Sequence, residues 1–129
     1  MKLSIIMPVY NEEKTIEKII ERVQKVNLGK IKKEIIIVND ASKDRSLNII
    51  DKIKKKYKNV KVFSHKVNQG KGASIRTGLK YFTGDIVVIQ DGDLEYNPED
   101  FKKLIKPILE NKSKVVYGSR LLGEERGFN

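Results

Sequence analysis

Short apolar runs and longer apolar stripes alternate along most of the chain. The runs are almost continuously apolar, which is typical of parallel strands that are buried on both faces. They predict strands at residues 3–7, 35–38, 60–64, 86–89 and 115–117. Between them apolar residues recur at spacings of three and four, which indicates amphipathic helices that pack one face on a sheet.

The first helix is predicted directly after the first strand. Pro8 is expected to end that strand, and Asn11 can cap the helix, with Glu12 and Glu13 in its first turn. Further helices are predicted at residues 47–57, 72–82 and 97–109, the last starting at Asn97-Pro98 and kinked or shortened at Pro107. Residues 118–129, with three glycines, are predicted to form a loop or frayed end.

This alternation predicts an α/β fold: a doubly wound, mainly parallel sheet with helices on both faces. The 129 residues suit one domain, spanning residues 1–129. Ligands of such sheets bind outside the carboxyl ends of the strands, near the point where the strand order reverses. The polar residues that follow each strand are therefore the first candidates for a functional site.

The composition narrows the classes of function. Cysteine is absent, which excludes disulfides and thiolate metal sites. No apolar run approaches the roughly 18 residues of a membrane span, and no signal-peptide pattern is present, so the cytoplasm is the expected location. Twenty-seven Lys and Arg against 17 Asp and Glu give a formal net charge of +10, which attracts nucleic acid, anionic membrane surfaces or phosphorylated ligands.

Most of the lysines are interpreted as solvated side chains. In segments such as KIKKKYKN and GKIKKE they alternate with apolar residues at helical or strand spacing. Attraction to a membrane surface is then a secondary consequence of the charge. The five Tyr and four Phe are scattered rather than interleaved with the basic residues, so a nucleic-acid-binding module is the less favoured alternative and no nucleic-acid partner is expected.

Asp91-Gly92-Asp93 is the most informative motif of the chain. It follows the apolar strand at 86–89, and the glycine allows both carboxylates to face one point. Two carboxylates that close repel each other unless a cation neutralises them, and oxygen ligands suit Mg²⁺ or Mn²⁺. The plain alternative is an acidic turn. A dehalogenase-like phosphohydrolase, with the first Asp as nucleophile, is a further alternative, but its D-x-D-x-[TV] pattern requires Thr or Val where Glu95 stands.

Three other polar clusters are expected near the same edge of the sheet. They are PVYNE at 8–12, NDASKD at 39–44 and NQGKG at 68–72. A base and a ribose need hydrogen-bond acceptors, which Glu12 and Asp40 could supply. The glycines around Lys71 allow close approach to a phosphate at a helix N-terminus, although a capped loop explains them as well. The only histidine, His65, is interpreted as a surface or packing residue.

Five ordered segments together resemble the family 2 glycosyltransferases of the GT-A fold. They are IIMPVYNEEKTI, EIIIVNDASKDRS, NQGKGASIRTG, GDIVVIQDGDLEYNPED and VVYGSR, spread over residues 3–120. The last two are most similar to the subgroup that transfers sugar to dolichyl or polyprenyl phosphate. Where the family usually has D-D-G-S, this chain has N-D-A-S, with Asn39 and Ala41 in place of an acidic residue and a glycine.

The resemblance implies a function and a set of site residues. The function is inverting transfer of sugar from a GDP-mannose or UDP-glucose type of donor to a lipid phosphate, on the cytoplasmic face of a membrane. The implied nucleotide-sugar ligands are Pro8, Tyr10, Asn11, Glu12, Asp40, Ser42, Lys71 and Asp91. Mg²⁺ or Mn²⁺ would be held by Asp91, Asp93 and Glu95, and catalysis would use Asp91, Asp93 and Arg120, the last facing the acceptor phosphate.

Family members continue well past the GSR segment. The chain is therefore expected to comprise the donor-binding half of the domain, without the acceptor-binding remainder. Apolar surface that the remainder would cover then favours self-association. A nucleotide-sugar binder without turnover is the main alternative to an active transferase.

Overall fold

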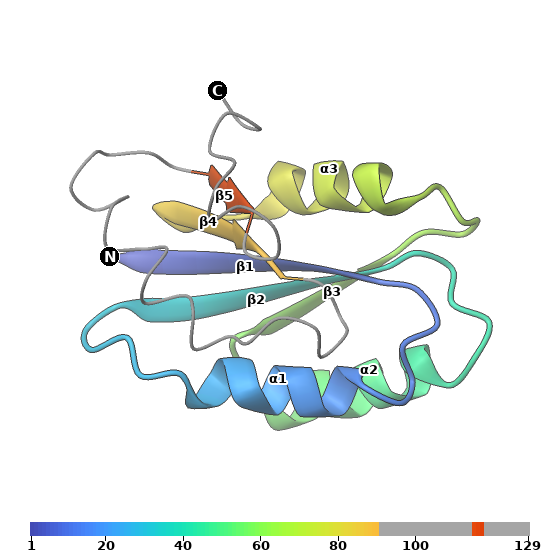
Figure 1. Cartoon of the computed structure of the whole chain (residues 1–129), viewed down its shortest axis with the longest axis horizontal. Helices are drawn as coiled ribbons and strands as arrows, with labels where there is room; N and C mark the ends of the chain where they lie inside the picture. Colours follow the sequence, from blue (N-terminus) through green and yellow to red (C-terminus); the bar gives the residue numbers. More distant parts are fainter. Residues whose placement is uncertain (91–114, 118–129) are drawn as a thin grey trace.

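The computed structural model describes residues 1–90 and 115–117. Five parallel strands form one sheet in the order β3-β2-β1-β4-β5 (Figure 1). The predicted helix at 97–109 and the tail at 118–129 lie outside the described residues. The elements are β1 (Lys2–Val9), α1 (Ile16–Lys25), β2 (Lys32–Asn39), α2 (Ser46–Lys56), β3 (Val60–Ser64), α3 (Lys71–Tyr81), β4 (Ile86–Ile89) and β5 (Val115–Tyr117).

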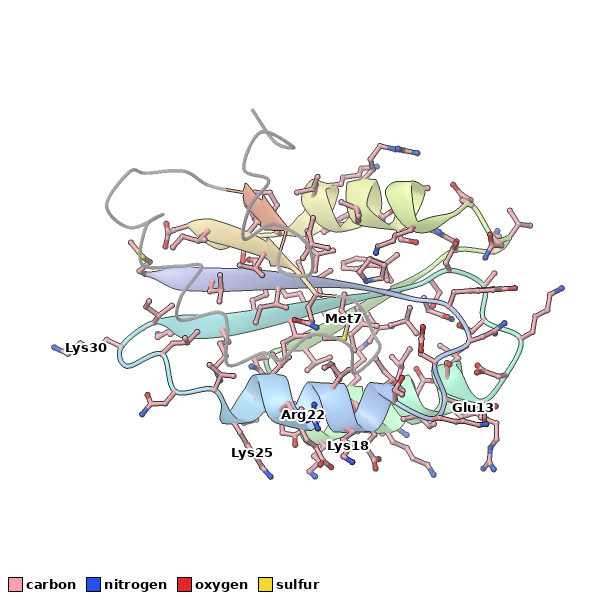
Figure 2. All side chains as sticks on the ribbon, viewed as in Figure 1. Met7, Glu13, Lys18, Arg22, Lys25 and Lys30 are labelled. Carbon is pink, nitrogen blue, oxygen red and sulfur yellow. The ribbon has the colours of Figure 1, made fainter. Side chains whose placement is uncertain are left out.

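Helices α1 and α2 cover one face of the sheet and α3 covers the other, as predicted (Figure 1). Side chains of a strand alternate between its faces, so odd-numbered residues of β1 face α1 and α2. Met7 lies between the sheet and α1 in Figure 2. The core on this side is formed by β1, β2 and the apolar stripe of α1, which includes Ile16, Ile19, Ile20 and Val23.

The opposite core is smaller and lies under α3. Ile6, Ile36 and Ile89 pack there against Leu79 and other partly buried residues of α3 and its flanks. Helix α3 lies close to β1, because a Cβ added to Gly78 would be 2.5 Å from Cγ2 of Ile6. The glycine therefore fixes how near the helix can come to the sheet.

Strand β1 continues through Pro8 to Val9, so the prediction that proline ends it is wrong. Ile6 O accepts a hydrogen bond from Gln90 N (2.9 Å), which shows that even-numbered residues of β1 turn their backbone groups toward β4. The β4 ladder ends at Ile89, so the missing N–H of Pro8 costs no strand-to-strand bond. Strand β1 therefore extends two residues beyond its predicted end at residue 7.

Helix α1 begins at Ile16 with Thr15 at its N-cap. The predicted capping role of Asn11 and the placement of Glu12 and Glu13 in the first turn are therefore wrong. A separate turn precedes the helix, in which Glu12 O accepts hydrogen bonds from Thr15 N (3.1 Å) and Ile16 N (2.9 Å). This turn leaves the residues after β1 free to contact the loop after β2.

A buried carboxylate lies near the amino ends of β1 and β2. Glu34 is 4% exposed and accepts hydrogen bonds from Ser4 Oγ (2.5 Å), Lys61 Nζ (2.7 Å), Thr83 N (3.0 Å) and Thr83 Oγ1 (2.9 Å). Burial by itself would raise the pKa of Glu34. The hydrogen bonds outweigh it and lower the pKa from 4.5 to about 2.

The interpretation of lysines as solvated holds for some and fails for others. Lys18, Arg22 and Lys25 point away from the sheet along the outer face of α1 (Figure 2). Lys33 is half-buried, and its Nζ donates to Val23 O (2.9 Å) and other carbonyl oxygens at the end of α1. It satisfies carbonyls that the helix end leaves without intrahelical partners. No helix within residues 1–90 is long and apolar enough to cross a membrane.

Candidate functional site

Three loops meet at the carboxyl edge of the sheet, on the right in Figure 1. They follow β1, β2 and β3, and they contain the clusters at 8–12, 39–44 and 68–72. From β1 the chain proceeds to β2 and β3 on one side, then returns to β4 on the other side of β1. The strand order therefore reverses between β1 and β4, which is where open α/β sheets bind their ligands.

Hydrogen bonds join the first two loops. Asn11 N donates to Ser42 Oγ (3.1 Å), and Lys43 N donates to Asn11 Oδ1 (2.8 Å). Glu12 N donates to Ser46 Oγ (2.8 Å), which ties the turn before α1 to the first residue of α2. The two loops, residues 8–12 and 39–46, are therefore joined by hydrogen bonds and are called the rim below.

Two non-glycine residues of this rim have left-handed backbone conformations. Asn11 has φ 52° and Ala41 has φ 58°. Asparagine tolerates this region, whereas alanine there costs about 1 kcal/mol. Ala41 thus takes a backbone conformation that glycine would adopt without this cost.

Asp40 organises the third loop. It is 3% exposed, and its Oδ1 accepts a hydrogen bond from Gln69 N (2.8 Å), while its Oδ2 accepts one from Gly70 N (2.8 Å). Its backbone O accepts a hydrogen bond from Asn68 Nδ2 (3.2 Å). Burial would raise the pKa of Asp40, but hydrogen bonds from His65, Gln69 and Gly70 outweigh it and hold the pKa below its usual value.

His65 is a residue of this edge that the sequence interpretation missed. Its side chain is 10% exposed, its Nδ1 lies 2.8 Å from Asp40 Oδ1, and its Nε2 lies 2.8 Å from Thr77 Oγ1. The surface location considered for it is therefore wrong. The one signal in the sequence was its position, directly after β3 and so at the same edge as Asp40.

The third loop leads into α3 through Gly70. This residue has φ 94° and ψ 164°, a conformation open essentially only to glycine. Lys71 follows as the first residue of α3 and is exposed. The N-terminus of α3 has no side-chain cap, and it lies at the edge where the other two loops end.

The remaining candidates in the described part of the chain surround this edge. Tyr10 is 42% exposed, and Pro8 is half-buried at the end of β1. Glu12 is half-buried, and its Oε2 accepts a hydrogen bond from Thr15 Oγ1 (3.1 Å). The structure therefore brings to one edge the predicted donor-site residues Pro8, Tyr10, Asn11, Glu12, Asp40, Ser42 and Lys71.

The other predicted site residues, Asp91, Asp93, Glu95 and Arg120, lie outside the described residues. Among the described residues no group of three or more His, Cys, Asp or Glu side chains could hold a metal ion. Strand β4 delivers the chain to the carboxyl edge, where Gln90 N donates to Ile6 O of β1 (2.9 Å). Asp91 is the next residue in the sequence.

Comparison with known proteins gives a consistent result. The family described as glycosyl transferase family 2 matches residues 4–129. A dolichyl-phosphate beta-glucosyltransferase of Trichomonas vaginalis is 34% identical over 137 residues, which cover 96% of this chain and 41% of the relative. The chain thus spans about two fifths of that relative's length.

Two solved structures share the fold. The crystal structure of S. aureus TarS 1–349 in complex with UDP has a TM-score of 0.74 and 34% identity, over 88% of this chain and 33% of that one. Mannosyltransferase PcManGT from Pyrobaculum calidifontis, in complex with GDP-Man and Mn²⁺, has a TM-score of 0.68 and 26% identity, over 76% of this chain and 29% of that one. The predicted α/β fold of the GT-A type is thereby confirmed.

Proposed function

The chain belongs to glycosyl transferase family 2, and on that premise we propose that its carboxyl edge binds a nucleoside-diphosphate sugar for transfer to a lipid phosphate. The family is shown, whereas transferase activity of this chain, the donor, the acceptor and the roles of individual residues are parts of the proposal. The family assignment also removes the support for a dehalogenase-like phosphohydrolase.

One observation supports the donor site above all others. The loops after β1, β2 and β3 meet beside the reversal in strand order, in a fold shared with a UDP complex and a GDP-Man complex. At this edge Tyr10 offers an exposed aromatic face to a base, and Glu12 and Asp40 offer acceptors to a base or ribose. Lys71 offers a cation at a helix N-terminus, where a diphosphate is favoured.

A divalent cation fits the residues that follow β4. Carboxylate oxygens of Asp91, Asp93 and Glu95 would hold it. The hydrogen bond from Gln90 to β1 supports this, because it holds the residue before Asp91 near the carboxyl edge of the sheet, called the donor edge below. Mg²⁺ or Mn²⁺ at this position would stabilise the negative charge that develops on the departing nucleoside diphosphate. PcManGT with GDP-Man and Mn²⁺ supports this assignment by analogy.

A lipid phosphate suits the chemistry as acceptor. Its second ionisation, with a pKa near about 6, leaves it largely charged at neutral pH, so it needs no general base. One phosphate oxygen forms the new bond to the anomeric carbon as the bond to the donor diphosphate breaks, which inverts the configuration. Arg120 would hold the acceptor phosphate through its planar guanidinium. A lipid acceptor would place the working enzyme at a membrane surface.

The proposal predicts metal-dependent stabilisation by a nucleotide. UDP or GDP at about 100 times its Kd should raise the free energy of unfolding by roughly 2.7 kcal/mol, which is a shift in Tm of roughly 10 °C for this size. Thermal unfolding with UDP, GDP, ADP and CDP, each with and without Mn²⁺ or Mg²⁺, measures it. Asp93→Ala should abolish the metal-dependent part, and Asp51→Ala, on the exposed face of α2, should leave it unchanged.

Stabilisation that is equal for all four nucleotides and insensitive to metal would contradict the donor site. Turnover is a separate readout, in which the sugar nucleotide of the stabilising base is mixed with polyprenyl phosphate in detergent. Release of nucleoside diphosphate supports the transferase proposal for this chain. Binding without release supports the alternative of a donor binder without turnover.

A further inference from the structure

His65 connects three elements next to the proposed donor site. Its backbone N donates to Asn39 O at the end of β2 (2.9 Å). Its Nδ1 contacts Asp40 and its Nε2 contacts Thr77 of α3, each at 2.8 Å. With a side chain only 10% exposed, His65 contacts neighbouring side chains rather than solvent.

The ionisation of Asp40 determines which ring nitrogen of His65 carries a hydrogen. Asp40 is ionised, since its hydrogen bonds hold its pKa below the usual value against the effect of burial, and a carboxylate only accepts hydrogen bonds. The Nδ1 of His65 therefore carries hydrogen and donates to Oδ1. Thr77 Oγ1, which also lies 3.1 Å from Ala73 O in α3, holds the other side of the ring.

The carboxylate of Asp40 accepts three hydrogen bonds from the described residues. Each carboxylate oxygen has about two acceptor positions. Within residues 1–90, Oδ1 accepts from Gln69 N and His65 Nδ1, and Oδ2 accepts from Gly70 N. Among the described residues, the second acceptor position of Oδ2 has no donor. His65 thus fixes the orientation of the carboxylate that holds both the loop and this remaining acceptor.

We propose that His65 is a positioning residue of the donor site, which acts through Asp40 to hold Gln69, Gly70 and the start of α3 in the conformation that receives the nucleotide. This inference rests on the proposed function. His65 does not touch the nucleotide itself. It differs from a packing residue because its effect depends on donation of one hydrogen bond to Asp40.

Two amide substitutions separate the contacts of the ring. The amide nitrogen of asparagine takes nearly the place of Nδ1, so His65→Asn keeps a donor to Asp40. Glutamine extends its amide toward the place of Nε2, so His65→Gln keeps a partner for Thr77 and loses the one for Asp40. His65→Leu fills the volume without a donor. The three variants therefore distinguish donation to Asp40 from support of α3 and from packing.

The first readout is the Kd of the parent chain for UDP and GDP with Mn²⁺, by calorimetry. A hydrogen bond to a charged group predicts that His65→Gln and His65→Leu weaken binding about tenfold, and that His65→Asn weakens it no more than about threefold. In an Asp40→Asn background, where a neutral amide oxygen accepts from His65 less strongly than the carboxylate does, the losses in His65→Gln and His65→Leu should shrink to about threefold or less. Equal losses in all three variants, or an undiminished loss in that background, would overturn the positioning role.

The second readout needs no nucleotide. Hydrogen exchange of the Gln69 and Gly70 amides should accelerate about tenfold in His65→Gln and His65→Leu and stay near the parent rate in His65→Asn. Faster exchange with unchanged nucleotide affinity would reduce His65 to a structural residue and overturn the inference. A parent chain that binds no nucleotide would instead overturn the proposed function, and the inference with it, which the parent titration reveals first.

Discussion

Asp40→Ala is expected to lower the free energy of unfolding by about 3 kcal/mol, because it removes a buried carboxylate that accepts three partly buried hydrogen bonds. The N–H groups of Gln69 and Gly70 and the Nδ1 of His65 all donate to this carboxylate. Urea unfolding of parent and variant at neutral pH measures the loss. The same variant should lose metal-dependent nucleotide binding, since the loop that leads into α3 is no longer held.

Asp51→Ala is the matched control for Asp40→Ala. Asp51 is exposed on α2, so its replacement should change the free energy of unfolding by less than about 0.5 kcal/mol. If Asp40→Ala lowered the free energy of unfolding as little as Asp51→Ala, water would be replacing the hydrogen bonds of Asp40 at little cost. The carboxylate would then not organise the donor edge.

Glu34→Gln is expected to cost about 3 kcal/mol at neutral pH, which is the free energy equivalent of lowering its pKa from 4.5 to about 2. Glutamine keeps the size of the side chain but not the charge that Lys61 and the donors from Ser4 and Thr83 stabilise. Because the folded-state pKa is depressed, this stability is complete above the unfolded-state pKa and declines as the pH falls toward about 2.

The difference in free energy of unfolding between the parent chain and Glu34→Gln should depend on pH. Urea unfolding at pH 7, 5, 4 and 3 should show a difference between parent and Glu34→Gln that shrinks to about half its neutral value at pH 3. Glu17→Gln, on the exposed side of α1, should differ from the parent by less than about 0.5 kcal/mol throughout. A difference at position 34 that stays constant with pH would mean that ionisation of Glu34 does not stabilise the fold.

Apolar pattern alone predicted the sheet well. The predicted strands at 60–64, 86–89 and 115–117 match β3, β4 and β5. For β4 the reason is that its fully apolar run ends where the buried strand ends. The stripe that includes Ile75 and Leu79 placed α3 within one residue of its observed bounds. These strands and helices depend on residues that are close together in the sequence, so the local pattern is enough to predict them.

Features set by distant residues escaped prediction. Asn11 resembles a helix cap, but its side chain bonds to Lys43, 32 residues away. Glu34 lies among lysines as a solvated residue would, yet its partners in β1 and before β4 are 30 and 49 residues distant. His65 becomes informative only when folding brings Asp40, 25 residues earlier, to its ring. The meeting of the loops after β1, β2 and β3 was predicted, because the carboxyl ends of parallel strands share an edge. Their role in donor binding stays a prediction.

Amide chemical-shift mapping tests the central claim most directly, namely that the carboxyl edge between β1 and α3 binds a nucleoside diphosphate. Isotope-labelled chain is titrated with UDP and with GDP in the presence of Mg²⁺, which does not broaden the signals. Saturable shifts at residues 8–12, 39–44 and 65–72 are expected with one of the two nucleotides. Shifts confined to the outer face of α1 and α2, or to the amino edge around Glu34, would contradict the account.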